Sequence, residues 1–209
     1  MCSSDLHGVA ANHNGTPGNA AAGGGIMFSS NTRESADCRV FDAYSNKNLG
    51  SQVRLTGSKF PKRVAGLTVW GGQFERGAHA DPLVPVIAVE AADRTTFFGC
   101  NVIQPKGKPA PCVVFGGGQG MVRDTSFVSC YFQYTGKKST LAAKGQIESV
   151  AFVDCRFGGK ADLFDFDADL PKGSIYFSRP IDLARGKGRD RKSTRLNSSH
   201  LVISYAVFC

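Results

Sequence analysis

Four six-residue segments share one pattern: Val69-Trp-Gly-Gly-Gln-Phe74, Phe97-Phe-Gly-Cys-Asn-Val102, Phe127-Val-Ser-Cys-Tyr-Phe132 and Phe152-Val-Asp-Cys-Arg-Phe157. Each begins with an apolar residue, carries Cys or Gly at its fourth position and ends with an apolar residue. The last three positions alternate inward, outward, inward, as in a β-strand, whereas the three-residue step before them breaks that alternation. The pattern therefore predicts a corner between two short strands in every unit.

Further short apolar runs lie between and before these units, many of them next to turns that contain Gly or Pro. They are Ile26–Phe28, Arg39–Phe41, Gln52–Leu55, Val86–Val89, Cys112–Phe115, Leu141–Ala143 and Leu163–Phe166. A repeat of about 25 to 30 residues with short strands and no helical periodicity buries its apolar face by stacking on its neighbours. The sequence therefore predicts an all-β solenoid with an internal ladder of Cys100, Cys130 and Cys155, continued by Gly72.

The recurring Phe-x-x-Cys-x-Phe unit resembles the repeat of the pectin-lyase-like right-handed parallel β-helix family, which includes pectate lyases and phage tailspikes. The segment from Gly23 to Phe28 resembles the start of that family's first strand, although Ser29 to Arg33 departs from the turn that commonly follows. The resemblance implies a right-handed parallel β-helix that acts on, or binds, polysaccharides. It also implies a location outside the cell or on a virion surface.

Both ends of the chain resemble translated sequencing adapter, over residues 1–6 and 190–209. On this interpretation the protein is truncated at both ends and the two segments carry no function. We therefore expect a poorly ordered or linker-like segment at 7–23, a β-helix fragment at 24–183, and a disordered basic linker with the adapter-derived tail at 184–209.

Composition excludes several classes of protein. The chain carries 25 Lys and Arg against 17 Asp and Glu, a formal net charge of +8. Its basic run near the C-terminus overlaps the adapter-like segment, so we predict no nucleic-acid partner, and the absence of a long apolar stretch predicts no membrane span. Outside the adapter-like ends five cysteines remain without a Cys-x-x-Cys pair, which favours core positions over a zinc site or disulfide framework.

Cations recur in the glycine-containing turns after each unit. They are Arg76, Lys106, Lys108, Lys137, Lys138 and Lys160, with Arg156 and Lys144 as flanking candidates. If the coils stack, these side chains form a basic edge suited to an anionic polysaccharide. The alternative is a row of solvated turns that discourages edge association.

Asp165 and Asp167 are the candidate catalytic residues. Their i, i+2 spacing on one strand face places the backbones about 6.5 to 7 Å apart. That separation suits an inverting glycosidase, and the pair is also a candidate calcium site, with no other cofactor or metal expected. The alternative is a solubilising outer face. Trp70 and Tyr131 are candidates for presenting rings to sugars, and Trp70 packing at a corner is the alternative for that residue.

Two functions of different classes follow from these observations. The first is a carbohydrate-interacting β-helix protein, acting as a polysaccharide lyase or hydrolase on an anionic glycan. The second is a non-catalytic tailspike or adhesion module, for which we expect a homotrimer. The repeat itself favours neither, because a fold does not determine an activity.

Overall fold

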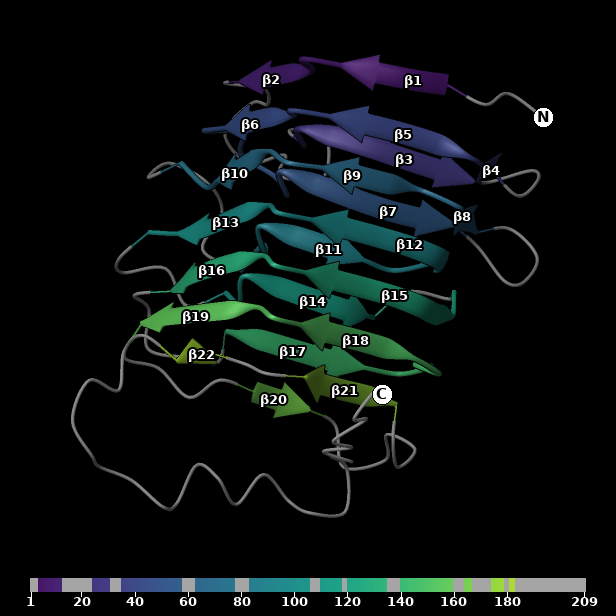
Figure 1. The fold of residues 1–209 in the computed structure, drawn as a ribbon, viewed down its shortest axis with the longest axis vertical. Helices are drawn as coiled ribbons and strands as arrows, with labels where there is room; N and C mark the ends of the chain where they lie inside the picture. The colour runs from purple at the N-terminus through teal and green to yellow at the C-terminus, as the bar shows by residue number, and fades with distance from the viewer. Residues whose placement is uncertain are drawn as a thin grey trace, which may run out of the picture.

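A computed structural model describes residues 4–12, 24–30, 35–57, 63–77, 83–105, 110–117, 120–134, 140–159, 164–166, 174–178 and 181–182. Throughout these ranges the regular structure is β, with 22 strands and no helix. The strands are two to seven residues long and wind into stacked coils (Figure 1). This confirms the predicted all-β solenoid.

The strands form three parallel sheets, which we call sheets I, II and III. Sheet I contains β1 (Ser4–His7), β5 (Cys38–Phe41), β9 (Thr68–Trp70), β12 (Ala92–Phe98), β15 (Val122–Val128), β18 (Val150–Val153) and β21 (Ile175–Ser178), with the short β4 (Ser35–Ala36) and β8 (Val64–Ala65). Sheet II contains β2 (Ala10–Asn12), β6 (Tyr44–Asn46), β10 (Gln73–Glu75), β13 (Asn101–Gln104), β16 (Tyr131–Tyr134), β19 (Arg156–Gly159) and β22 (Ile181–Asp182). Sheet III contains β3 (Ile26–Ser30), β7 (Val53–Gly57), β11 (Ile87–Val89), β14 (Val113–Gly116), β17 (Leu141–Lys144) and β20 (Phe164–Phe166).

Successive coils contribute neighbouring strands to each sheet, so equivalent residues of successive coils lie in register. Phe97 of β12 pairs with Val69 of β9 on one side and with Phe127 of β15 on the other. The apolar runs predicted between the units form strands of sheet III, as in the pairing of Ile87 with Val113. In all three sheets the strands are parallel and follow one another in chain order, so the sequence repeat runs along the solenoid axis.

The corner between sheets I and II is a single residue with a left-handed backbone. Gly99 has φ 64° and Ser129 has φ 53°, and Asp42, Gly71 and Asp154 occupy the same position in other coils with φ between 52° and 66°. One left-handed residue turns the chain and moves the next side chain inward. This is the physical origin of the broken alternation in the six-residue unit.

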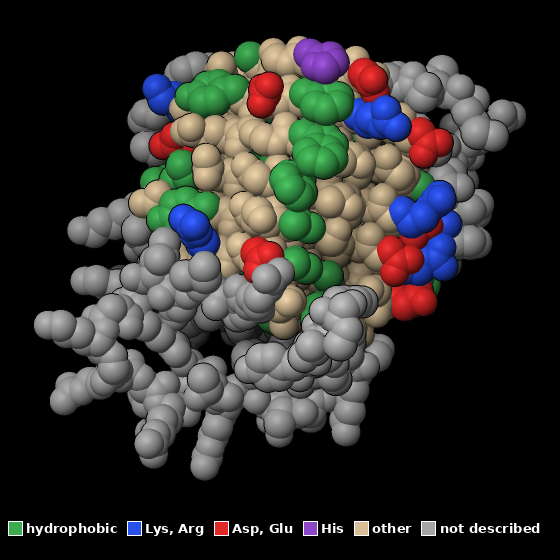
Figure 2. All heavy atoms as spheres, viewed as in Figure 1, with side chains coloured by type: hydrophobic (Ala, Val, Ile, Leu, Met, Phe, Trp, Pro, Cys, Tyr) green, Lys and Arg blue, Asp and Glu red, His purple; other side chains and the backbone are tan. Residues whose placement is uncertain are grey.

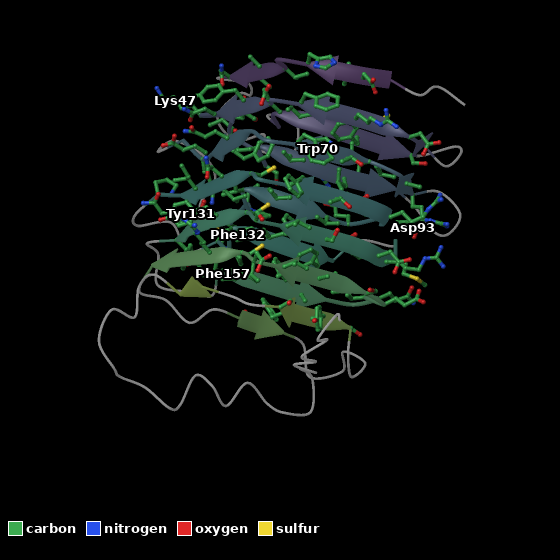
Figure 3. The ribbon with its side chains drawn as sticks, viewed as in Figure 1. Lys47, Trp70, Asp93, Tyr131, Phe132 and Phe157 are labelled. Carbon is green, nitrogen blue, oxygen red and sulfur yellow. The ribbon has the colours of Figure 1, made fainter. Side chains whose placement is uncertain are left out.

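Stacked phenylalanines fill the interior. Phe127 is fully buried and lies parallel to Phe97, with ring centroids 4.7 Å apart, and parallel to Phe152 at 5.2 Å. On sheet II, Phe132 stacks on Phe157 at 5.2 Å, and Figure 3 shows these two rings on neighbouring coils. Because each buried ring contributes about 1.5 to 3 kcal/mol, these ladders make a large contribution to stability.

The cysteine ladder also forms as predicted. Cys100, Cys130 and Cys155 are buried free thiols on successive coils. The Cys130 thiol donates a hydrogen bond to the Phe97 carbonyl at 3.4 Å, and the Cys155 thiol donates one to the Phe127 carbonyl at 3.2 Å. Each thiol therefore contacts a carbonyl of the preceding coil.

Gly72 occupies the same ladder position because a side chain does not fit there. A Cβ atom at this residue would lie 2.7 Å from the Ala43 carbonyl oxygen, and φ is 117°. Such a backbone conformation is open to glycine and rarely to other residues. The interruption of the cysteine ladder is thus a packing requirement.

The solenoid begins earlier than the boundary predicted at Gly24. Strand β1 pairs in register with β5, and β2 pairs with β6. The segment repeats the unit in a weaker form, since Gly8 has φ 60° and takes the corner position. The expectation of a linker-like stretch over 7–23 is therefore wrong for residues 7–12. Residues 13–23 and 183–209 lie outside the described part of the chain.

Candidate functional site

A row of mainly aromatic side chains follows the outer face of sheet I, and we call it the aromatic stripe. It consists of His7, Phe41, Trp70, Phe98, Val128 and Val153, which pair in register from strand to strand. Figure 2 shows this row as a band of green side chains that runs down the molecule below the purple histidine.

Strand alternation places these residues outward. Phe97, Phe127 and Phe152 point into the core, so the residue after each one points to solvent. The left-handed corner follows immediately, which leaves the stripe at the last outward position before the chain turns. The stripe is therefore a necessary consequence of the repeat, but its aromatic content is not.

The central rings are well exposed. Trp70 is 43% exposed and Phe98 is 37% exposed. Their ring centroids are 4.6 Å apart and their planes are inclined by 43°, so the two rings do not cover each other completely. At the N-terminal end His7 and Phe41 stack in parallel, with centroids also 4.6 Å apart. Figure 3 labels Trp70 on this face.

Uncharged polar groups flank the central part of the stripe. On the same strands, two residues earlier, lie Thr68, Thr96 and Ser126, and the hydroxyl oxygens of Thr96 and Ser126 are 3.0 Å apart. Across the corner, the outward positions of sheet II are Gln73 and Asn101, which pair in register. The stripe thus lies between hydroxyl and amide groups.

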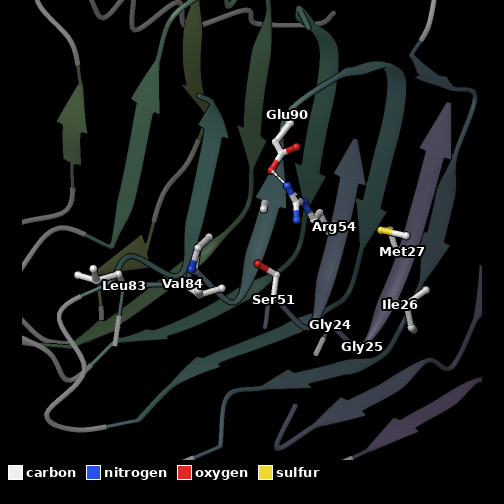
Figure 4. A pocket seen from close by; sticks show the side chains of 11 residues that line it. Gly24, Gly25, Ile26, Met27, Ser51, Arg54, Leu83, Val84 and Glu90 are labelled. Carbon is white, nitrogen blue, oxygen red and sulfur yellow. Dashed lines mark hydrogen bonds and ion pairs between the residues drawn. The ribbon is translucent and has the colours of Figure 1, made fainter. Parts of the chain in front are cut away.

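A hollow lies on the outer face of sheet III, away from the aromatic stripe. It has a volume of about 470 Å³ and is bordered by Met27, Arg54, Leu83, Ala88 and Glu90 among others (Figure 4). Arg54 forms an ion pair with Glu90 at 2.8 Å, which neutralises both charges. The hollow is therefore a depression of mixed polar and apolar lining whose two charged side chains pair with each other.

The outward position predicted for Arg76 is wrong. Its side chain is 1% exposed, and its backbone N–H donates to the carbonyl of Ile103. Alternation along β10 explains this, because Phe74 points inward, Glu75 outward and Arg76 inward again. Gln104 and Tyr134 take the corresponding buried positions on the following coils.

The remaining basic residues are not brought together by the described structure. Arg156 is exposed on sheet II, whereas Lys144 is exposed on sheet III. Five members of the predicted basic edge lie outside the described residues. They are Lys106, Lys108, Lys137, Lys138 and Lys160. For these five the basic edge stays a prediction.

Of the two candidate catalytic carboxylates, one is described. Asp165 is exposed on β20, in register with Ala142 of β17 on sheet III, and so lies on a different sheet from the aromatic stripe. Asp167 lies outside the described residues. Within the described residues no three His, Cys, Asp or Glu side chains form a cluster able to hold a metal ion.

The strongest electrostatic feature is the buried carboxylate of Asp93, at the N-terminal end of strand β12 in sheet I. Asp93 accepts hydrogen bonds from Arg123 at 2.8 and 2.9 Å and forms an ion pair with Arg63 at 2.7 Å. Hydrogen bonding from Arg123, together with Arg63, lowers the pKa of Asp93 to about 2. Both oxygens of Asp93 are engaged, which indicates a structural clamp between coils.

Sequence reasoning assigned Trp70 as a candidate sugar platform but missed the stripe as a whole. The signal was the second position of each six-residue unit, which holds Trp70, Phe98, Val128 and Val153. It also missed two weaker units, Leu6 to Ala11 and Val40 to Ser45, that supply His7 and Phe41. Tyr131, the other candidate ring, is half-buried over Gly158 of the next coil.

The fold and its outer face define a parallel β-solenoid with an exposed aromatic stripe. Comparisons with protein-family models, curated proteins and solved structures find no match to this chain. Among the described residues there is no helix of the length and hydropathy that a membrane span requires.

Proposed function

We propose that this chain is a carbohydrate-binding β-solenoid that holds an extended polysaccharide along the aromatic stripe. The observation that carries the proposal is the pair of exposed rings, Trp70 and Phe98, continued by Phe41 in register. The C–H groups of a sugar ring are partly positive and pack against the negative face of an aromatic ring. A contiguous exposed apolar row of this kind is a mark of a binding surface.

The spacing of the stripe supports an extended ligand. Successive coils are separated by about 4.8 Å, close to the length of one sugar unit in an extended chain. Because Phe41, Trp70 and Phe98 come from consecutive coils, one polysaccharide chain parallel to the solenoid axis meets a ring at each step. A single sugar would use only a fraction of this surface.

The resemblance of the repeat to pectin-lyase-like β-helices favours the same class of ligand. The proposal concerns binding. Cleavage as a lyase or hydrolase would rest on Asp165 and Asp167, of which Asp165 lies on sheet III and not beside the stripe. A non-catalytic adhesion or tailspike module is the second candidate, because the same exposed stripe would serve as the contact between copies in a homotrimer.

Intrinsic fluorescence tests the proposal directly, because Trp70 is the sole tryptophan of the chain. The full chain is titrated with soluble polysaccharides, namely hydroxyethylcellulose, carboxymethylcellulose, arabinoxylan, alginate and polygalacturonate. We expect at least one of them to quench or shift the Trp70 emission and to retard the protein in an affinity gel. Phe98→Ala should weaken that binding about tenfold, the factor that corresponds to one lost aromatic contact.

The matched control is Met27→Ala, which removes an exposed apolar side chain from sheet III. It should bind as the parent chain does. Failure of every polysaccharide to bind, or an equal loss in the Met27→Ala variant, would overturn the proposal. Sedimentation shows whether the stripe joins copies instead: a trimer that dissociates on Phe98→Ala and binds no glycan supports the structural module.

A further inference from the structure

We infer that the ligand of the aromatic stripe is a neutral, flat, β-1,4-linked glycan. This inference rests on the proposed function and adds the charge and shape of the ligand. It differs from the expectation of an anionic partner, which was based on the lysines of the turns. The charge of the ligand follows from the part of the stripe from Trp70 to Val128, which we call its central window.

The described side chains of the central window carry no charge. The stripe positions are Trp70, Phe98 and Val128, and the corner positions beside them are Gly71, Gly99 and Ser129. Charged residues next to the stripe lie at its two ends. Asp5, Arg39 and Asp42 belong to one end, where Arg39 pairs with Thr68, and Asp154 and Arg156 belong to the other. A carboxylate or sulfate on a bound glycan would therefore meet no cation among the described residues of the window.

The polar groups of the window match sugar hydroxyls. Thr68, Thr96 and Ser126 supply hydroxyls on one side of the stripe, and Asn101 supplies an exposed amide on the other. Hydroxyls and amides both donate and accept hydrogen bonds, as sugar hydroxyls do. An apolar surface with a few polar groups at its sides is the usual composition of a site for an uncharged ligand.

The net charge of the chain, unlike the uncharged central window, favours anionic ligands. At +8 the protein attracts any polyanion at low salt, whether or not the stripe takes part. Such attraction is screened within about 8 Å at physiological ionic strength, whereas ring stacking is insensitive to salt. Salt dependence therefore separates binding at the stripe from general attraction to the basic protein.

The shape of the ligand follows from the arrangement of the rings. Ring contacts on consecutive coils need a chain whose sugar faces stay exposed at every unit, which β-1,4-linked equatorial sugars provide. The stripe positions of the central window, Trp70, Phe98 and Val128, span two coil spacings, about 10 Å in total. Affinity should therefore rise with oligosaccharide length and level off at about three to four units.

A matched pair of polymers tests the inference. Hydroxyethylcellulose and carboxymethylcellulose share one β-1,4 backbone and differ in charge. The full chain is titrated with each polymer at low and at physiological salt, and Trp70 emission is recorded. We expect hydroxyethylcellulose to bind equally at both salt concentrations, and carboxymethylcellulose to lose the part of its binding that depends on charge.

Two substitutions separate ring stacking from general apolar contact. Phe98→Tyr keeps a ring and should retain binding within about twofold, whereas Phe98→Leu keeps apolar area without a ring and should weaken it about tenfold. Both variants retain Trp70 as the reporter. Circular dichroism of the two variants confirms that the solenoid is intact.

The outcomes distinguish the two claims. If carboxymethylcellulose binds more tightly than hydroxyethylcellulose at physiological salt, and Phe98→Leu weakens its binding, the stripe is a glycan site. The inference of a neutral ligand is then wrong. If neither cellulose derivative nor arabinoxylan binds but a neutral glycan of another linkage does, the β-1,4 assignment is wrong. If no polysaccharide binds at all, the proposed function and the inference fail together.

Discussion

Four cysteines lie buried in the coils as free thiols: Cys100, Cys112, Cys130 and Cys155. The hydrogen bond to the Cys130 thiol, together with burial, raises the pKa of Cys100 and of Cys155, and burial raises the pKa of Cys112. A thiol reacts as its thiolate, so a raised pKa and loss of solvent access both suppress the reactivity of Cys100, Cys112 and Cys155. Hydrogen bonds with the Cys100 and Cys155 thiols lower the pKa of Cys130, which is therefore protected by its burial alone.

These thiols give a prediction at the residue scale. In a variant with Cys2, Cys38 and Cys209 replaced by Ser, we expect Ellman's reagent to label no thiol in the native protein at neutral pH. All four buried thiols should react after unfolding in guanidinium. Rapid labelling of the native variant would show that the cysteine ladder is open to solvent, contrary to the described packing.

Strand alternation explains why two neighbouring phenylalanines differ in burial. Phe97 and Phe98 are chemically identical, yet one is fully buried and the other is on the surface. The difference arises from strand alternation alone, because adjacent side chains on a strand point to opposite faces. Alternation likewise buries Arg76, two residues after the inward Phe74.

At the scale of the element, the corner between sheets I and II sets the geometry of every coil. Gly99 has φ 64°, and a Cβ atom there would meet nothing within 4 Å. A substitution at this position therefore changes backbone strain without creating a clash. Substitutions at Gly99 therefore measure the free-energy cost of the left-handed backbone for a residue that has a side chain.

Gly99→Ala should lower the free energy of unfolding by about 1 kcal/mol, because a β-carbon is disfavoured in the left-handed region. Gly99→Asn should cost less, since Asn enters that region more readily than Ala. Urea denaturation followed by circular dichroism measures both variants. Equal stability of the Ala variant and the parent chain would mean that the corner is not left-handed at Gly99.

At the scale of the whole molecule, the Asp93 clamp joins three coils. Arg63 precedes β8, Asp93 lies on β12 and Arg123 on β15, so their contacts hold successive turns together. In a solenoid each coil contacts only its neighbours, and stability depends on the interfaces between them. The clamp adds an electrostatic link to an interface otherwise made by apolar ladders.

The clamp predicts acid sensitivity with a defined sign. The pKa of Asp93 is about 2 in the folded protein, below the ordinary Asp value of about 4 in the unfolded chain. Its charged form therefore stabilises the fold fully above about pH 4, and this contribution is lost as the pH falls through about 2. The free energy of unfolding should decline across that window.

Asp93→Asn should cost about 3 kcal/mol at neutral pH, because it leaves two arginines without their buried counter-charge. The stability difference from the parent chain should shrink as the pH approaches 2. Asp124→Asn is the control, since Asp124 is exposed and should have little effect. A difference that stays constant between pH 7 and pH 2 would contradict the role of the Asp93 charge.

The repeat alone determined the solenoid, because its spacing, its small fourth residue and its broken alternation are local properties of the chain. They were enough to predict the strands of sheet III and the stacked thiols of Cys100, Cys130 and Cys155. Local patterns suffice here because each coil repeats the same short-range geometry and packs on its nearest neighbours.

Only the tertiary structure decided which side chains outside the six-residue units meet across the coils. The register of four strands brings His7 and Phe41 into one stripe with Trp70 and Phe98, although they are distant in sequence. The Asp93 clamp likewise joins residues about 30 positions apart. Variable turn lengths between coils hide these neighbours from the sequence, since contacts along the axis depend on register and not on sequence separation.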